Sequence, residues 1–318
     1  KDRKELVMIE TIVSVDLPVD EKLLIKRYRL EPEIKTGHEN RISIVTASHG
    51  DELEGQYVCF KILNELKKNK DKIKGIIDVY PSLNPIGVDT ITRNMPYFDV
   101  DVNRIFPGNE NGSIPEYVAS KIIDSLVGSD VVIDIHASNI FLREVPQVRM
   151  DEDNSKKLLP LAEMVNTDFI WIYPAITVLE STLAYSLNEL NTPTLVVEMG
   201  VGMRVTQEYG DQLITGIYNI MKHLGIYETE EVYDIRKPII SSGENIFFLN
   251  SNTSGIFLPK IEHWMDVKKG DILGEVVDVL TGDVLEEVKS PSDGIVFTLR
   301  EYPVVYEGSL LGRIYGNK

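Results

Sequence analysis

The sequence has a single cysteine, Cys59, among its 318 residues. One cysteine cannot form an internal disulfide, and low cysteine usage is typical of a reducing compartment, so we expect a cytoplasmic protein. Cys59 lies in an amphipathic helical pattern, where we expect a small buried apolar residue. The sequence also lacks a run of about 20 apolar residues, so no transmembrane helix is expected. Glu10, Asp16 and Asp20 interrupt the N-terminal segment, unlike the apolar core of a signal peptide.

Positive charge is scarce: 33 Lys and Arg stand against 50 Asp and Glu, for a net charge of −17. Sequence-independent nucleic-acid binding depends on Lys and Arg that neutralise phosphates. The net negative charge therefore argues against binding to nucleic acid or to an anionic membrane surface. It does not exclude an acidic small-molecule substrate, because a few local arginines can set the field of a pocket.

Apolar runs and helical patterns alternate over residues 1–228. After two strands in residues 5–31, the expected strands are 42–47, 75–80, 131–135, 169–173 and 194–198. The expected helices are 51–69, 115–127, 155–166, 180–190 and 206–223. Asp51 and Glu54 have the spacing of a capping box for the first of these helices. This alternation predicts an α/β domain with a mostly parallel sheet and helices on both faces.

Residues 229–318 carry no helical pattern. Turn signals such as Lys269-Gly270-Asp271 and Ser292-Asp293-Gly294 separate short strands. We therefore predict a second, small all-β domain over this range.

Two histidines stand at the carboxyl ends of buried strands. His49 follows the run 42–47 and precedes Glu52 by three residues, and His136 follows the run 131–135. In an open α/β sheet these ends line the crevice that binds ligands. Two histidines and a carboxylate are a three-ligand set for catalytic zinc, with a fourth position for water. Co, Mn or Fe would suit the same atoms. The other histidines lie beside polar or loop residues and are expected at the surface: His38, His223 and His263.

Taken alone, His49 and Glu52 also fit a helix-capping segment with an incidental histidine. A hydrolytic site needs a proton acceptor too, and Glu198 closes the apolar run 194–197, where it would face the same crevice. It could take a proton from water and return it to a leaving amine. The alternative for Glu198 is a strand-end salt bridge.

The long loop 93–107 carries the other polar candidates. Arg104 could hold a substrate carboxylate through a bidentate contact, with Asn103 adding a hydrogen bond. Arg93 could polarise a scissile carbonyl. Asp101 could orient a metal-binding histidine. A surface loop with solvated charges is the alternative, but the loop's length and its place between strand and helix favour function.

These segments together resemble the succinylglutamate desuccinylase/aspartoacylase family of the zinc carboxypeptidase superfamily. The matching segments occur in the family's order and span residues 49–200. They are His49-Gly50-Asp51-Glu52-Leu53-Glu54-Gly55, Asn84-Pro85, Asp101-Val102-Asn103-Arg104-Ile105-Phe106-Pro107-Gly108, Asp134-Ile135-His136 and Val197-Glu198-Met199-Gly200.

The resemblance implies a zinc-carboxypeptidase-like sheet and one zinc ion per subunit. It implies particular site roles: His49, Glu52 and His136 as metal ligands, Asn103 and Arg104 as carboxylate binders, Glu198 as general base and Arg93 as the carbonyl-polarising arginine. The reaction implied is hydrolysis of a small N-acyl amino acid or amine. Some members read a second substrate carboxylate with an arginine and place a tyrosine near the substrate. The candidates here are Arg143, Arg149, Tyr302 and Tyr306.

Within the β domain, the segments 267–274 and 288–296 resemble strands of a biotinyl/lipoyl-like barrel. The turn between them is Thr281-Gly282-Asp283 and has no carrier lysine. The resemblance therefore predicts a wall beside the active site or an interface, not a swinging-arm carrier.

Other functions fit parts of the sequence. A zinc carboxypeptidase acting on peptides or cell-wall fragments would use the same metal chemistry. A dinucleotide-binding oxidoreductase has only Gly200-Val201-Gly202 in its favour, with Val205 where the third glycine should stand. The complete ligand set with Glu198 argues against a non-catalytic binding protein. The composition permits a homo-oligomer without predicting one.

Overall fold

The computed structural model describes residues 7–174 and 180–316. Its centre is a sheet whose inner strands run parallel, in the order β4, β3, β5, β8. Antiparallel strands flank them, with β2 and then β1 beside β4, and β6 beside β8; β7 pairs parallel to β6. The bounds are β1 Val7–Asp16, β2 Lys22–Leu30, β3 Arg41–Thr46, β4 Ile76–Tyr80, β5 Val131–His136, β6 Leu142–Asp151, β7 Phe169–Tyr173 and β8 Thr194–Gly200. The predicted α/β sheet is confirmed as a mixed sheet with a parallel centre.

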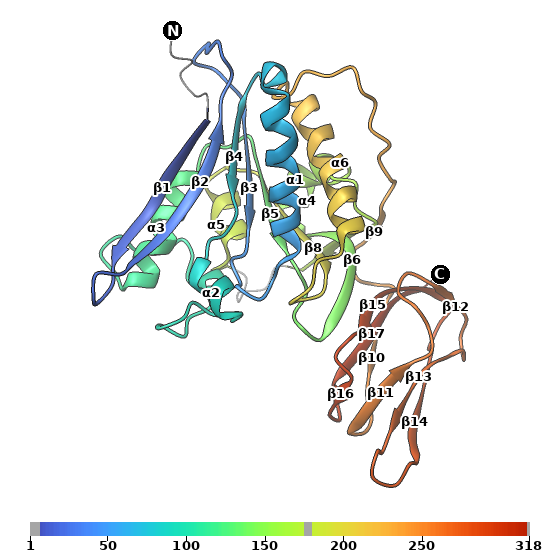
Figure 1. Ribbon diagram of the computed structural model, residues 1–318. Helices are drawn as coiled ribbons and strands as arrows, with labels where there is room; N and C mark the ends of the chain where they lie inside the picture. Colours follow the sequence, from blue (N-terminus) through green and yellow to red (C-terminus); the bar gives the residue numbers. More distant parts are fainter. Residues whose placement is uncertain (1–6, 175–179, 317–318) are drawn as a thin grey trace.

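Helices cover both faces of this sheet (Figure 1). One face packs against α1, α4 and α6, and the other against α3 and α5. The helical bounds are α1 Glu54–Lys68, α2 Pro85–Thr90, α3 Ile114–Leu126, α4 Glu152–Ala162, α5 Leu183–Glu189 and α6 Gln207–His223, with short 3₁₀ turns η1 Lys70–Lys72 and η2 Val102–Arg104.

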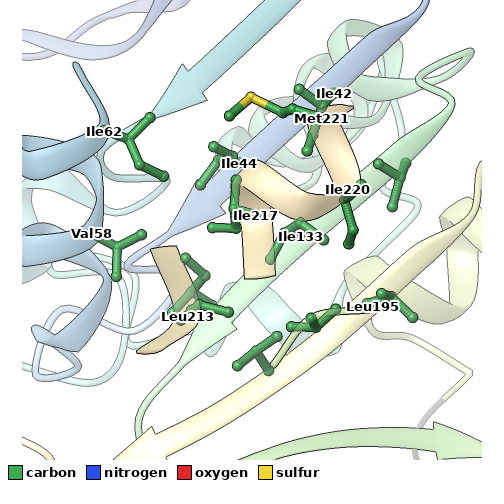
Figure 2. Packing of buried hydrophobic residues seen from close by; sticks show 14 of the residues in the cluster. Ile42, Ile44, Val58, Ile62, Ile133, Leu195, Leu213, Ile217, Ile220 and Met221 are labelled. Carbon is green, nitrogen blue, oxygen red and sulfur yellow. The ribbon is translucent and has the colours of Figure 1, made fainter. Parts of the chain in front are cut away.

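Strand alternation distributes the core between these two layers. Ile133 of β5 faces α1 and α6, while its neighbour Val132 faces α3 and α5. Figure 2 shows Val58 of α1 and Ile217 of α6 meeting the sheet around Ile133. Cys59 is buried in the same layer, as expected, and burial raises the pKa of its thiol to about 12.

The capping box expected for α1 is wrong. The helix begins at Glu54, and Leu53 at its N-cap makes no side-chain capping bond. The Glu54 carboxylate instead accepts hydrogen bonds from the backbone N–H and the hydroxyl of Thr206, at the start of α6. Gly200 lies directly against it with a φ of +68°, and a Cβ at Gly200 would stand 1.8 Å from Glu54 Oε1. Glycine is therefore the only residue that fits at position 200, two residues after Glu198.

The C-terminal strands extend the same sheet and add a second one. β15 pairs antiparallel with β6, then β17 and β10 follow, and β9 pairs with β7. The second sheet has the order β14, β13, β11, β16, with an apolar core between the two layers. The bounds are β9 Ile239–Ser241, β10 Ile246–Asn250, β11 Gly255–Pro259, β12 Asp266–Val267, β13 Ile272–Val277, β14 Val284–Lys289, β15 Gly294–Arg300, β16 Val304–Val305 and β17 Leu310–Gly316.

All regular elements described after α6 are strands, so the expected all-β region is confirmed. Residues 228–238 carry no regular element, and the domain boundary after residue 228 stays a prediction. Among the described helices, none combines the length and apolar character needed to cross a membrane.

We expect Ile133→Ala to lower the free energy of unfolding by about 2–5 kcal/mol, because it opens a cavity between the sheet and its helices. Ile34→Ala is the matched control: Ile34 is 84% exposed, whereas Ile133 is fully buried. Urea denaturation of both variants measures the difference. Equal stability losses would contradict the proposed core.

Candidate metal and active site

Parallel strand ends bring the predicted residues together. His136 is the last residue of β5, and its register partner on β8 is Glu198. β3, the other neighbour of β5, leads into the turn that carries His49 and Glu52. All four side chains line one cavity of about 750 Å³, together with Arg93, Asn103 and Arg104. The structure therefore brings together the residues expected as metal ligands, general base, carboxylate binders and carbonyl-polarising arginine.

His49, Glu52 and His136 form a compact buried group. Their nearest ligand atoms all lie within 4.8 Å of one another. The Nδ1 atom of His49 lies 2.7 Å from Glu52 Oε1, and the Nδ1 atom of His136 lies 3.1 Å from Glu52 Oε2. The backbone N–H of Ala137 also donates to Glu52. Two imidazole nitrogens and a carboxylate converging on one point fit a transition-metal ion.

A second carboxylate faces the far side of each imidazole ring. Asp101 lies 3.0 Å from His49 Nε2, as the sequence predicted for this residue, and Asp134 lies 3.1 Å from His136 Nε2. The Asp101 contact is a hydrogen bond, and a carboxylate bound in this way fixes the tautomer that leaves Nδ1 free to bind a metal. The Asp134 contact is close enough for an ion pair but lacks hydrogen-bond geometry. Asp134 is fully buried, and its role was not predicted from the sequence. The Asp-x-His spacing within one strand is the signal that could have revealed it.

The electrostatics of Glu52 suit a metal ligand. Burial raises its pKa, but the two adjacent histidines outweigh burial and lower the pKa to about 2. Glu52 is therefore ionised at neutral pH, as ligation requires. Burial lowers the pKa of His136, but the Asp134 and Glu52 carboxylates more than compensate and hold it well above the usual value.

Glu198 faces the cavity from β8 with 17% of its side chain exposed. Its ion-pair partner Arg149 is at 3.5 Å, the outer limit of a hydrogen bond. Burial raises the pKa of this carboxyl, and Arg149 and His136 moderate the rise. A carboxylate with a raised pKa that keeps one long contact to an arginine is suited to proton exchange.

The long loop presents three polar residues to the same cavity. Asp101 caps the short turn η2 by accepting from the Asn103 N–H, and Asn103 and Arg104 line the same cavity as the candidate metal ligands. The Asn103 side-chain oxygen accepts from Leu183 N–H, so its amide nitrogen is the group left for a ligand. Arg93 donates to both Glu52 and Asp101, at 3.2 and 3.1 Å.

The remaining candidates divide clearly. Arg149 lines the cavity, whereas Arg143 does not and pairs with Glu301 at 2.7 Å. Tyr302 and Tyr306 are exposed and do not line it either. The aromatic lining comes instead from three residues that sequence reasoning missed, which are Trp171, Tyr173 and Tyr185.

Outside the cavity, His38 and His223 are exposed as expected. His263 is not: it is half-buried between the Tyr209 hydroxyl and the Phe297 carbonyl, so the surface expectation for it is wrong.

Comparison with known proteins places this geometry in context. The family model for the Succinylglutamate desuccinylase/Aspartoacylase catalytic domain matches residues 38–224. The N-alpha-acetyl-L-2,4-diaminobutyric acid deacetylase of Halomonas elongata is 24% identical over 277 residues, covering 85% of this chain and 80% of the relative.

Solved structures share the fold over nearly the whole chain. A succinylglutamate desuccinylase from Silicibacter sp. TM1040 has a TM-score of 0.82 at 20% identity, covering 97% of this chain and 94% of that one. The product-bound ectoine utilization protein EutE (DoeB) from Ruegeria pomeroyi has a TM-score of 0.82 at 19% identity, covering 98% and 95%. The C-terminal strands are therefore part of the shared fold.

We expect His136→Ala to lose most of its bound transition metal, because two ligands rarely hold a metal that needs three. His38→Ala is the control, since His38 is exposed and outside the cavity. Metal analysis of both purified variants beside the wild type measures the effect. Wild-type metal content in His136→Ala would rule out His136 as a ligand.

Proposed function

Since the chain belongs to the succinylglutamate desuccinylase/aspartoacylase family, we propose that it is a zinc-dependent deacylase of small N-acyl amino acids or related N-acyl amines. The observation that carries the proposal is the convergence of His49, Glu52 and His136 beside Glu198 in one cavity. Membership of this family supports hydrolysis of an amide bond. The donor set supports zinc as the metal.

The residues divide the chemical work. A bound metal ion would supply a Lewis acid that activates water and polarises the scissile carbonyl. The Glu198 carboxylate accepts the proton of the attacking water and returns it to the leaving nitrogen. Arg93, which already lies beside Glu52, donates to the carbonyl oxygen as negative charge develops there. Burial of the ligand group limits competing water and strengthens these interactions.

Asn103 and Arg104 are the proposed binding site for the substrate carboxylate. Arg104 donates one Nη1 bond to the backbone oxygen of Asn103, and no carboxylate in the described part of the chain forms an ion pair with it. Its remaining donors match the two oxygens of a substrate carboxylate. This arrangement favours an N-acyl amino acid over a simple N-acyl amine.

The size and acidic lining of the cavity, together with the substrate named for one relative, restrict the class of substrate. A volume of about 750 Å³ lies within the range for small-molecule sites. The relative named N-alpha-acetyl-L-2,4-diaminobutyric acid deacetylase supports a substrate with a second, free amine. Asp151, Asp153 and Glu180 line the same cavity and would meet such an ammonium group with opposite charge. N-acetyl derivatives of diamino acids are therefore the first compounds to test, with N-acetylaspartate and short peptides alongside them.

We expect the zinc-loaded protein to hydrolyse at least one N-acetyl amino acid, and Glu198→Gln to retain metal while losing about 10²- to 10⁴-fold in kcat. The amide keeps the size of the side chain but cannot accept the proton. Glu208→Gln, an exposed glutamate outside the cavity, is the matched control. Release of free amine, measured by chromatography, reports turnover.

Wild-type turnover in Glu198→Gln would disprove the base assignment. Hydrolysis of peptides alone would favour the carboxypeptidase alternative instead.

We expect Arg104→Ala to raise KM by about 10- to 100-fold for a substrate with a free carboxylate, because it removes a charge-assisted hydrogen bond. The same compound with its carboxylate converted to an amide should bind the wild type weakly and be little affected by the substitution. Steady-state kinetics on the two compounds separate these effects. Equal losses on both would show that Arg104 does not read the carboxylate.

A further inference from the structure

A buried carboxylate, Glu144 on β6, stands at the back of the cavity without touching the metal ligands. It is 1% exposed and has four donors around it. Two belong to its own strand: Arg149 Nη2 at 2.9 Å and Gln147 Nε2 at 2.9 Å. The other two come from the C-terminal strands: Arg313 Nη1 at 2.8 Å and the Thr298 hydroxyl.

Strand pairing explains how these distant residues meet. Thr298 on β15 is the register partner of Glu144 on β6, and Arg313 on β17 is the register partner of Thr298. The three side chains therefore form one row across three strands. Two of the four partners of the buried Glu144 carboxylate therefore arrive only when the C-terminal strands pair with β6.

The two guanidinium groups of this cluster are also held by aromatic rings. Arg149 lies 5.5 Å from the ring centre of Trp171, and Arg313 lies 5.4 Å from the same ring and 5.4 Å from that of Phe248. Contacts of this kind restrict a planar guanidinium in both position and tilt. The Arg149 guanidinium thus contacts Glu144 through Nη2 and the Trp171 ring through its face, while its Nη1 atom donates to Glu198 at 3.5 Å.

We propose that Thr298 and Arg313 are positioning residues for the catalytic base. They fix the Glu144 carboxylate, Glu144 fixes Arg149, and Arg149 sets where the Glu198 carboxylate stands in the cavity. This assignment rests on the proposed function, because it takes Glu198 as the base. It gives the C-terminal strands a specific part in catalysis, since the base is correctly placed only when β15 and β17 have docked on β6.

Arg313→Met tests the proposal. Methionine keeps apolar contact with Trp171 and Phe248 but removes the bond to Glu144. Misplacement of a reacting group by about 1 Å can cost up to 10²-fold, so we expect kcat to fall by roughly 10- to 100-fold with KM and metal content little changed. Arg313→Lys restores a donor near Glu144 and should recover part of the lost kcat.

Arg300→Met is the matched control. Arg300 is a buried arginine of the C-terminal strands, and it lies 5.3 Å from the ring centre of Phe141, just before β6. Its guanidinium binds three backbone carbonyls and not Glu144. Arg300→Met should therefore lower stability without a comparable loss of kcat in the folded fraction. Equal kcat losses in the two methionine variants, or a change confined to KM in Arg313→Met, would overturn the proposal.

Crystal structures of the wild type and Arg313→Met separate this proposal from the proposed function. The expected result is a displaced Arg149 and a moved Glu198 carboxylate, which can be seen whether or not a substrate is known. Unmoved side chains would overturn the positioning role, while an inactive wild type with a displaced Glu198 in the variant would overturn the proposed function alone. If Arg313→Met does not fold, Thr298→Val removes one bond to Glu144 with little change in shape, and the same outcomes apply.

Discussion

The Glu52 carboxylate is almost completely withdrawn from water, and a charge in that position needs a partner for each oxygen. Its partners come from separate parts of the chain: the turn after β3, the end of β5, the Ala137 N–H and the long loop through Arg93. These parts converge because β3 and β5 are parallel neighbours, in register up to the Thr46–Ile135 pair. The rest of the cavity depends on this meeting point, because His49, His136 and the loop residue Arg93 all contact Glu52.

The residues of the candidate metal site could be predicted from the sequence because their signal is local. His49 and His136 each follow an apolar run, and parallel strands bring their carboxyl ends to one edge of a sheet. Glu198 follows the same logic on β8. Helix α1 shows where local rules fail: the spacing of Asp51 and Glu54 satisfies the capping pattern, yet Glu54 is drawn to Thr206, which is 152 residues away. Tertiary contact with a second helix outweighs the local cap.

The cluster around Glu144 could not be predicted, because its residues lie far apart in the sequence and follow no periodic pattern. Glu144 meets Thr298 and Arg313 only through the pairing of β6 with β15 and β17, across separations of 154 and 169 residues. The all-β character of the C-terminal region was readable from its turns, but its attachment to the main sheet was not. That attachment covers what would otherwise be an open edge at β6, and it brings Arg313 of β17 to the cavity lining.

Among the residues that the structure describes, four arginines line the cavity of this strongly acidic protein, and their partners distinguish their roles. Arg93 donates to Glu52, a candidate metal ligand, and to Asp101 beside it. Arg149 and Arg313 both donate to the buried Glu144, so their positive charge is largely neutralised within the protein. Within the described chain, Arg104 alone of the four binds only a backbone oxygen. A free carboxylate entering this cavity would therefore find its strongest uncompensated donor at Arg104. Such a substrate would lie with its carboxylate at the loop and its amide bond toward His49 and Glu198.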